Sequence, residues 1–236
     1  MSLFVSQNLP CPSCGKSIEF AVNFSVNADR RPDFRAAIID GSFQSEECGN
    51  CGTPFRLEPE MTYLDIGRGQ WILVRPASKR QEWPMLEADA RDAFDLAFGD
   101  AAPAPARAIG AGLTARVTFG WAALREKLLC REAGIDDATL EMLKLLLMRT
   151  MPETPLTADT ELRFGGVQGD ELHLAWIRFD DESVVETMVV PRGLYDDIDK
   201  SGEDWRGLRE QLTAGTYVDV TRLLVEPADA RAEAAD

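Results

Sequence analysis

The chain has 236 residues, of which 45% are hydrophobic, and it carries a formal net charge of −15. This apolar content excludes a wholly disordered chain, and the length allows one large domain or two small ones. No run approaches 18 consecutive apolar residues and no signal-peptide pattern opens the sequence, so we expect a cytoplasmic protein that does not bind membranes.

The negative charge is unevenly distributed along the chain. Residues 1–84 carry nine Lys/Arg and ten Asp/Glu, whereas residues 85–236 carry sixteen Lys/Arg and thirty Asp/Glu. Nonspecific nucleic-acid binding depends on cations that neutralise phosphates, and an acidic surface repels those phosphates. A basic protein surface is therefore the easier electrostatic partner for most of this chain.

Two short segments repeat one cysteine pattern. Residues 11–20 read CPSCGKSIEF and residues 48–57 read CGNCGTPFRL, so each holds a C-x-x-C pair followed by Gly. Disulfides are uncommon in a reducing cytoplasm, where clustered thiols more often bind metal or carry out redox chemistry. Four thiolates are a common ligand set of a structural zinc ion. We therefore predict one structural Zn²⁺ ion with four ligands, Cys11, Cys14, Cys48 and Cys51.

The residues around these pairs favour closed metal-binding turns. Gly15 and Gly52 suit the left-handed conformation that lets the chain double back after the second cysteine of each pair. Two other uses of the thiols stay open, an iron–sulfur cluster and a redox pair, although a redox pair is expected at the start of a helix. The fifth cysteine, Cys130, lies in a helical stretch and is predicted to be a core residue.

Residues 1–83 are predicted to form a zinc-ribbon-like β module. Apolar side chains alternate from residue 18 to 26, which is typical of a strand. The 33 residues between Cys14 and Cys48 exceed the usual ribbon spacing, and a short helix between Pro32 and Gly41 explains the insertion. Two apolar runs around a Gly-Arg-Gly turn predict a hairpin over residues 61–75.

Residues 84–150 are predicted to be a helical segment that contains a linker. An amphipathic helix opens at Trp83-Pro84 and stops at Gly99. The Ala/Pro/Gly-rich residues 99–112 read as a flexible spacer.

Beyond this spacer, a short strand at 113–119 leads into helices at 121–132 and 137–148, the second of them capped by Asp136-Asp137. The second helix is apolar on nearly all sides from Leu140 to Met148. It therefore lies in the core or forms the face of a homodimer.

The cysteine motifs and these helices together resemble the CpXC-domain proteins of bacteria and archaea. The resemblance rests on CPSCG, CGNCG and YLDIGRGQWILVRP, and on LREKLLCREAGIDDATLEMLKLLL, where an "EK" helix precedes a "DD…E…LK" helix. It covers residues 8–148, and the second cysteine motif departs from the family pattern by lacking the Pro of the first. It implies a fold and zinc binding, but no reaction.

Residues 151–226 are predicted to form an acidic, β-rich domain, followed by a frayed acidic tail at 227–236. The segments TELRFGGV, ELHLAWIRF and ETMVV indicate three antiparallel strands, and a helix at 203–212 and a strand at 217–225 follow. The only histidine, His173, lies on a strand and is interpreted as structural. Two acidic clusters, at 180–182 and 196–199, are interpreted as solvated loops because they lack the ligand spacing of a calcium site.

The sequence thus predicts an α+β protein with a zinc-ribbon-like module, a helical middle segment and an antiparallel β-rich domain. No catalytic residue is predicted, and the favoured function is a zinc-stabilised adaptor that binds another protein. An enzyme that uses carboxylates of the C-terminal domain is one alternative. A nucleic-acid-binding zinc ribbon is another, and its basic face would comprise Arg30, Arg31, Arg35, Arg56, Arg68, Arg75, Lys79 and Arg80.

Overall fold

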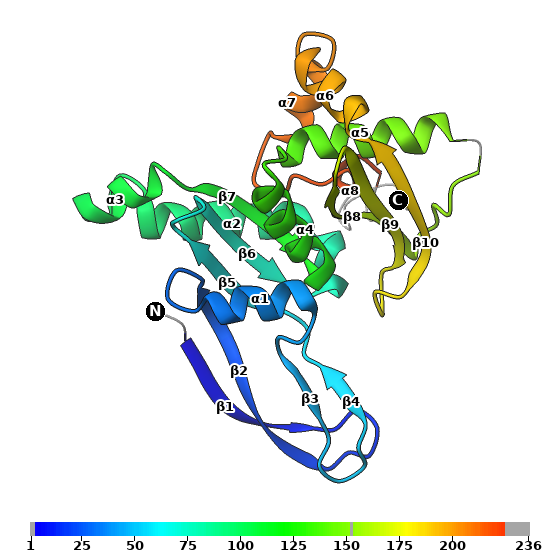
Figure 1. Ribbon diagram of the computed structural model, residues 1–236. Helices are drawn as coiled ribbons and strands as arrows, with labels where there is room; N and C mark the ends of the chain where they lie inside the picture. Colours follow the sequence, from blue (N-terminus) through cyan, green and yellow to red (C-terminus); the bar gives the residue numbers. More distant parts are fainter. Residues whose placement is uncertain (1–2, 152, 225–236) are drawn as a thin grey trace, which may run out of the picture.

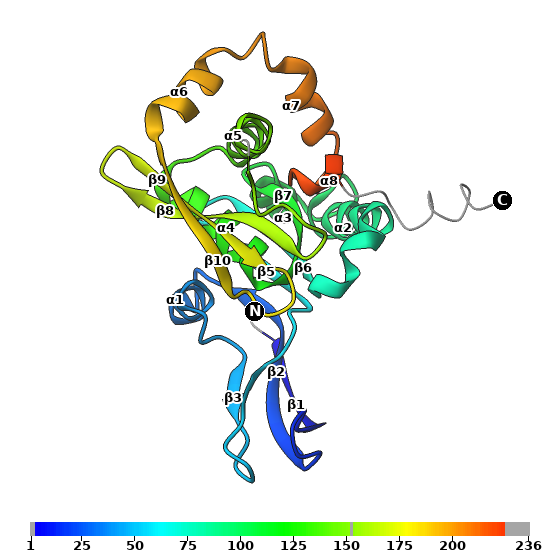
Figure 2. The same cartoon turned by 90° about the vertical axis from the view of Figure 1, so that its right-hand side faces the viewer.

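The computed structural model describes residues 3–151 and 153–224. These residues form a mixed α+β fold with eight α-helices and three β-sheets, which confirms the predicted class (Figure 1). Two β-hairpins project from one side of a larger, layered part of the molecule (Figure 2). We call the projecting residues 3–24 and 45–56 the arm, and we call the remaining described residues the body.

A five-stranded sheet joins the arm to the body. Its strand order is β1-β2-β5-β6-β7, with antiparallel pairs β1–β2 and β5–β6 and parallel pairs β2–β5 and β6–β7. The predicted strands after the first cysteine pair, in the 61–75 hairpin and at 113–119 are confirmed, whereas the exposed first strand was not predicted. The strands are β1 (Leu3–Pro10), β2 (Ser17–Asn27), β5 (Met61–Asp65), β6 (Gln70–Arg75) and β7 (Thr114–Phe119).

Helices cover both faces of this sheet, and β6 is buried from both sides. Its side chains alternate, so that Ile72 packs in the core beneath α1 (Pro32–Asp40) and α4 (Gly120–Ala133). Trp71 packs on the opposite face against α2 (Trp83–Phe98). The three helices confirm the predicted ones. A short 3₁₀ helix, η1 (Ala77–Glu82), precedes α2.

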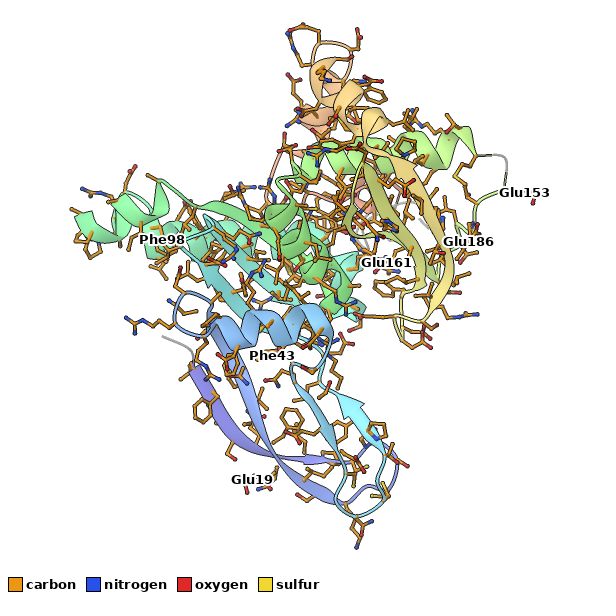
Figure 3. All side chains as sticks on the ribbon, viewed as in Figure 1. Glu19, Phe43, Phe98, Glu153, Glu161 and Glu186 are labelled. Carbon is orange, nitrogen blue, oxygen red and sulfur yellow. The ribbon has the colours of Figure 1, made fainter. Side chains whose placement is uncertain are left out.

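The core beneath α4 crosses a predicted domain boundary. Tyr63 and Ile72, from the predicted module at residues 1–83, share this core with Trp121 and Leu124. Phe43 extends the core toward the arm, and its ring lies 5.8 Å from that of Trp121 (Figure 3). The 61–75 hairpin therefore belongs to the body, although it follows the second cysteine pair directly in sequence.

Residues 99–112 are not a structureless spacer, which corrects the predicted linker. They contain α3 (Ala104–Gly110), and Pro105 fits into the first turn of this helix, where a missing N–H costs little. The segment carries the chain from α2 back to β7, which pairs with β6 in parallel. A parallel pair requires a long crossover connection, and α2 with α3 supplies it.

A second layer contains α5 (Asp137–Thr150) and a three-stranded antiparallel sheet in the order β10-β9-β8. The three predicted strands are confirmed as β8 (Thr160–Gln168), β9 (Glu171–Arg178) and β10 (Val184–Pro191). Leu140 and Leu143 of α5 are fully buried in the core that this layer forms. This apolar helix could lie in the core or form the face of a homodimer, and the structure places it in the core.

The C-terminal part of the described chain differs from the prediction in two places. Helix α6 (Arg192–Lys200) was not predicted, and it precedes α7 (Arg206–Leu212). The predicted strand at 217–225 is wrong, because residues 217–220 are irregular and α8 (Thr221–Leu224) follows them. Their backbone pairs with side chains instead: Tyr217 N–H donates to Glu87 over 2.8 Å, and Val220 N–H donates to Glu141 over 2.9 Å.

The predicted tail at 227–236 lies outside the described residues. Within the described ranges, none of the helices combines the length and the apolar composition that crossing a bilayer requires.

Candidate metal centre

Both cysteine pairs lie in hairpin turns at the end of the arm. The first turn joins β1 to β2, and the second joins β3 (Ser45–Glu47) to β4 (Pro54–Arg56). The two turns have the same backbone hydrogen bond, from Gly15 N–H to the Cys11 carbonyl at 2.9 Å and from Gly52 N–H to the Cys48 carbonyl at 2.8 Å. Both glycines have φ of 69°, which confirms the predicted left-handed conformation.

The four thiols converge in one cluster. The Sγ atoms of Cys11 and Cys51 are 3.7 Å apart, as are those of Cys14 and Cys48. All four sulfur atoms lie within 4.8 Å of one another. In a tetrahedral ion with sulfur ligands at about 2.3 Å, two sulfurs are separated by about 3.8 Å. The donor set and its spacing therefore fit one metal ion.

The surroundings of the thiols act in different directions: hydrogen bonds lower the pKa of Cys11, whereas burial and the neighbouring thiols Cys51 and Cys11 raise that of Cys48 to about 11. Asn50 Nδ2 donates to Cys14 Sγ over 3.4 Å, and Ser13 N–H donates to Cys11 Sγ over the same distance. A hydrogen bond with Thr53 lowers the pKa of Cys51 to about 6. Because neighbouring thiolates repel one another, full deprotonation of the four thiols requires a cation among the sulfurs.

The other interpretations of the cysteines fit the geometry less well. Both C-x-x-C pairs lie between strands, whereas a thioredoxin-type pair begins a helix. A multi-iron cluster binds its thiolates through different iron atoms, and sulfurs this close together leave room for a single ion. Cys130 is buried in α4 of the body, away from the cluster, as predicted for a core residue.

The arm has few apolar contacts of its own. None of the three hydrophobic cores found in residues 3–151 and 153–224 includes a buried residue of the arm. The two hairpins touch through the Phe20 and Phe55 rings, whose centroids are 5.7 Å apart. Gln44 accepts a hydrogen bond from the backbone N–H of Asn23 on β2 over 2.9 Å. Figure 3 shows Glu19 on β2, pointing away from the body.

The basic residues of the N-terminal part are mostly neutralised within the chain. Arg80 lies 3.3 Å from Glu161, and Arg35 lies 2.8 Å from Glu132. Of the eight residues in the predicted basic face, Arg30 alone has no carboxylate within 4.0 Å among the described residues. The others with a carboxylate partner are Arg31, Arg56, Arg68, Arg75 and Lys79.

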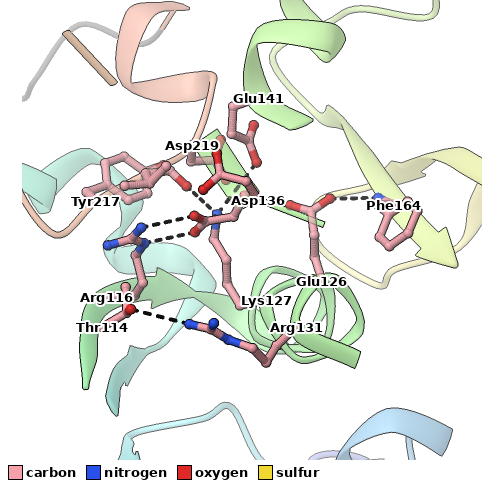
Figure 4. A network of polar contacts seen from close by, with 12 residues as sticks. Thr114, Arg116, Glu126, Lys127, Arg131, Asp136, Glu141, Phe164, Tyr217 and Asp219 are labelled. Carbon is pink, nitrogen blue, oxygen red and sulfur yellow. Dashed lines mark hydrogen bonds and ion pairs between the residues drawn. The ribbon is translucent and has the colours of Figure 1, made fainter. Parts of the chain in front are cut away.

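A second polar cluster, not predicted from the sequence, lies inside the body (Figure 4). The ammonium of Lys144 lies 2.7 Å from Glu126 and 2.9 Å from Glu141, and all three side chains are fully buried. Arg163 extends the cluster, because it lies 3.0 Å from Glu126 and 2.7 Å from Asp219. We call this cluster the ion network. It ties α4, α5, β8 and residue 219 together.

The ion network continues toward the protein surface through Asp137. Arg116 donates two hydrogen bonds to Asp137, over 2.8 and 3.0 Å, and Lys127 Nζ lies 3.0 Å from the same carboxylate. Burial by itself raises the pKa of Asp137, but the charges of Lys127 and Arg116 outweigh it and hold that pKa well below its usual range.

The ion network contains as many cations as carboxylates. Glu126, Glu141 and Asp219 lie close enough together to suggest a cation site, but the ammonium of Lys144 already lies against two of them. The sequence signal was the presence of two charged residues, Glu141 and Lys144, within the otherwise apolar stretch 140–148 of this helix. The carboxylates are Glu126, Asp137, Glu141, Glu161 and Asp219, and the cations are Arg80, Arg116, Lys127, Lys144 and Arg163.

The two acidic clusters noted in the sequence do not form a common site. Glu182 accepts a hydrogen bond from the Ala122 N–H over 2.8 Å, at the start of α4, and pairs with Arg125 over 2.9 Å. The cluster at 196–199 lies on α6 and is not a loop. Asp199 there accepts a hydrogen bond from Thr139 over 3.2 Å.

The cysteine cluster and the ion network together identify the class of protein. The "EK" and "DD…E…LK" residues of the sequence include Glu126, Lys127, Asp137, Glu141 and Lys144, and all of these meet in the ion network. A family model described as CpXC protein matches residues 9–144, more than half of the chain. The chain therefore belongs to the CpXC protein family. No curated protein and no solved structure matches it.

Proposed function

We propose that the four thiols bind one zinc ion and that the arm is a zinc-ribbon-like module. The observation that carries this proposal is the pair of 3.7 Å sulfur–sulfur distances, which fit tetrahedral coordination. Four soft thiolates favour zinc over the hard cations Mg²⁺ and Ca²⁺, which prefer oxygen ligands.

The zinc has a structural role in this proposal. Four thiolates fill a tetrahedral coordination shell, so that no position is left for an activated water molecule. The ion instead joins two hairpins that share few apolar contacts. Metal binding then contributes directly to the free energy of folding of the arm.

The arm presents a surface for another protein. Strand β1 is an edge strand of the five-stranded sheet, and it exposes Leu3, Phe4 and Val5 to 57, 62 and 44%. Edge strands offer unpaired backbone groups to which an extended segment of a partner can add. We propose that the protein is an adaptor without catalytic activity, and that its acidic charge favours a basic partner.

The alternatives have less support. A nucleic-acid-binding face in the N-terminal part would need free cations, and seven of the eight candidate residues already lie beside carboxylates. An enzyme that uses the C-terminal carboxylates would need them to converge, but Glu182 and Asp199 bond to different elements. A homodimer through residues 140–148 would need an exposed stripe on α5, and this helix is covered by the chain itself.

The metal proposal is tested by elemental analysis of the purified protein. We expect one zinc per chain in the wild type and none in Cys11→Ser or Cys48→Ser. Cys130→Ser is the matched control, because this buried thiol lies outside the cluster, and it should keep one zinc. A wild type without zinc, or a coloured iron-containing protein, would contradict the proposal.

The adaptor proposal is tested by a pull-down from the native host after nuclease treatment, with wild-type and Cys48→Ser chains as baits. A partner of the arm should bind the wild type and be lost with the variant, and purified partner should then bind the purified wild type directly. Retention of nucleic acid that weakens steeply with salt would favour the nucleic-acid alternative instead.

A further inference from the structure

A cavity lies beside the ion network, between the sheet and the helices α4 and α5. It has a volume of about 190 Å³ and is lined by residues of β6, β7, α4 and the start of α5. This volume corresponds to about six water molecules at roughly 30 Å³ each. Its charged lining residues are three cations, Arg116, Lys127 and Arg131, and two carboxylates, Asp136 and Asp137.

The three cations differ in how many of their hydrogen-bond donors remain free. Lys127 pairs with Asp137, and Arg116 donates to the same carboxylate, so both cations are largely engaged. Arg131 is exposed, and it has one hydrogen bond within the described part of the chain, from Nη2 to Thr114 Oγ1 over 3.3 Å (Figure 4). A guanidinium carries five N–H donors, so Arg131 keeps free donors at the cavity.

Gln70 contributes an acceptor without a partner to the cavity wall. Its side-chain Nε2 donates to the Lys127 carbonyl over 3.0 Å, which fixes the orientation of the amide. Gln70 is only 5% exposed, and its buried Oε1 accepts no hydrogen bond from any residue that the structure describes. An unsatisfied buried acceptor costs free energy, and a ligand that donates a hydrogen bond would relieve this cost.

We propose that this cavity binds a small hydroxycarboxylate. The wall holds three cations against two carboxylates, and one of these carboxylates, Asp136, also pairs with Arg209 over 2.9 Å, so the wall attracts an anion. The carboxylate of the ligand pairs with Arg131, and its hydroxyl donates to Gln70 Oε1. The cavity volume is enough for a ligand of a few heavy atoms. This site lies in the body and is independent of the metal centre.

The proposal is tested by calorimetric titration of the full-length, metal-loaded protein with racemic lactate and with glycolate. We expect saturable binding of at least one of them. Propionate, which lacks the hydroxyl, should bind about fivefold more weakly, because it leaves Gln70 Oε1 unsatisfied.

Two arginine variants locate the binding. Arg131→Gln keeps the fold, because this side chain is exposed, and it should weaken binding at least tenfold. Arg91→Gln, an exposed arginine on α2 outside the cavity, is the matched control and should bind as the wild type does. The proposal is overturned if neither hydroxycarboxylate saturates, if propionate binds as well as lactate, or if Arg131→Gln binds like the wild type.

Discussion

The arm and the body both bring together groups that are negative when deprotonated, and they differ in the source of the counter-charge. In the ion network of the body, the chain supplies its own cations, and the ammonium of Lys144 lies within 3 Å of both Glu126 and Glu141. In the arm, four thiols gather within 4.8 Å of one another, and they receive hydrogen bonds from two neutral donors, the Ser13 N–H and Asn50 Nδ2. In the proposed zinc-bound form, the counter-charge of the arm comes from an ion in solution, so we expect the order of the arm, but not that of the body, to depend on metal.

The two regions differ in apolar packing as well. The body has three hydrophobic cores, and it contains all five tryptophans of the chain. The arm has a single pair of phenylalanine rings in contact, Phe20 with Phe55. We therefore expect the folding free energy of the arm to come mainly from metal binding, and that of the body to come from burial of apolar surface.

The largest expected effect is loss of the arm in Cys48→Ser. Metal binding contributes on the order of 10 kcal/mol to comparable small zinc modules at neutral pH. We expect the amide resonances of residues 17–24 and 45–56 to collapse toward random-coil values in NMR spectra. Urea unfolding followed by tryptophan fluorescence reports on the body, and its midpoint should match that of the wild type. A lowered midpoint would show that the body depends on the arm.

The next largest effect is expected in the body, for Lys144→Met. This substitution leaves Glu126 and Glu141 buried without their shared ammonium, which costs about 3–5 kcal/mol. Urea unfolding should show this loss, while zinc content stays at one per chain. Lys200→Met, at the exposed end of α6, is the control and should change stability by less than about 0.5 kcal/mol. A loss below about 1 kcal/mol in Lys144→Met would contradict the role of the ion network.

Acidification should affect the two regions in opposite directions. Burial raises the pKa of Glu141 to about 7, so its contribution to stability is complete below about pH 4.5 and is lost as the pH rises through 7. Despite burial, nearby cations lower the pKa values of Glu126, Asp137 and Asp219, whose contributions are complete above about pH 4 and are lost on further acidification.

The body should therefore be more stable near pH 5 than near pH 8. The arm should lose order over the same change, because protons compete with the metal for the thiolates. Urea unfolding and zinc content, both measured across this range, check the two trends. Parallel pH profiles for zinc content and body stability would contradict the comparison.

The smallest effect is expected at the glycines of the metal-binding turns. Gly15→Ala places a side chain at φ of 69°, which costs about 1–2 kcal/mol although no atom lies within 4 Å of the new Cβ. Zinc affinity, measured by competition with a chelator, should fall about five- to thirtyfold. Gly49→Ala lies in the second turn without positive φ and also has open space, so it should keep the wild-type affinity. Equal affinities for all three proteins would show that turn conformation does not limit metal binding.

Local signals in the sequence predicted the elements that depend on single residues. Pro32 and Gly41 bracket α1 as expected, and Asp136 caps α5 through a 2.9 Å hydrogen bond from the Thr139 N–H. The cysteine cluster was also predictable, because paired C-x-x-C motifs have few uses.

Features that depend on distant residues could not be predicted in the same way. The ion network joins Lys144 to Glu126, 18 residues away, and Arg163 to Asp219, 56 residues away. The pattern around Tyr217 predicts a strand, but the backbone N–H of this residue donates to a side chain, Glu87, and not to another strand. The Ala/Pro composition of residues 99–112 is typical of a linker and gives no signal for α3. The position of this helix depends on the parallel pairing of β7 with β6.

The central claim, that a metal ion holds the arm while the body holds itself, is tested most directly by hydrogen exchange measured with and without a zinc chelator. The account predicts that amides of the arm at residues 17–24 and 45–56 lose protection on chelation. Amides of β6 and α4 should exchange at unchanged rates, because their core contains no arm residue. Equal protection of the arm without metal, or a matching loss in β6, would contradict the account.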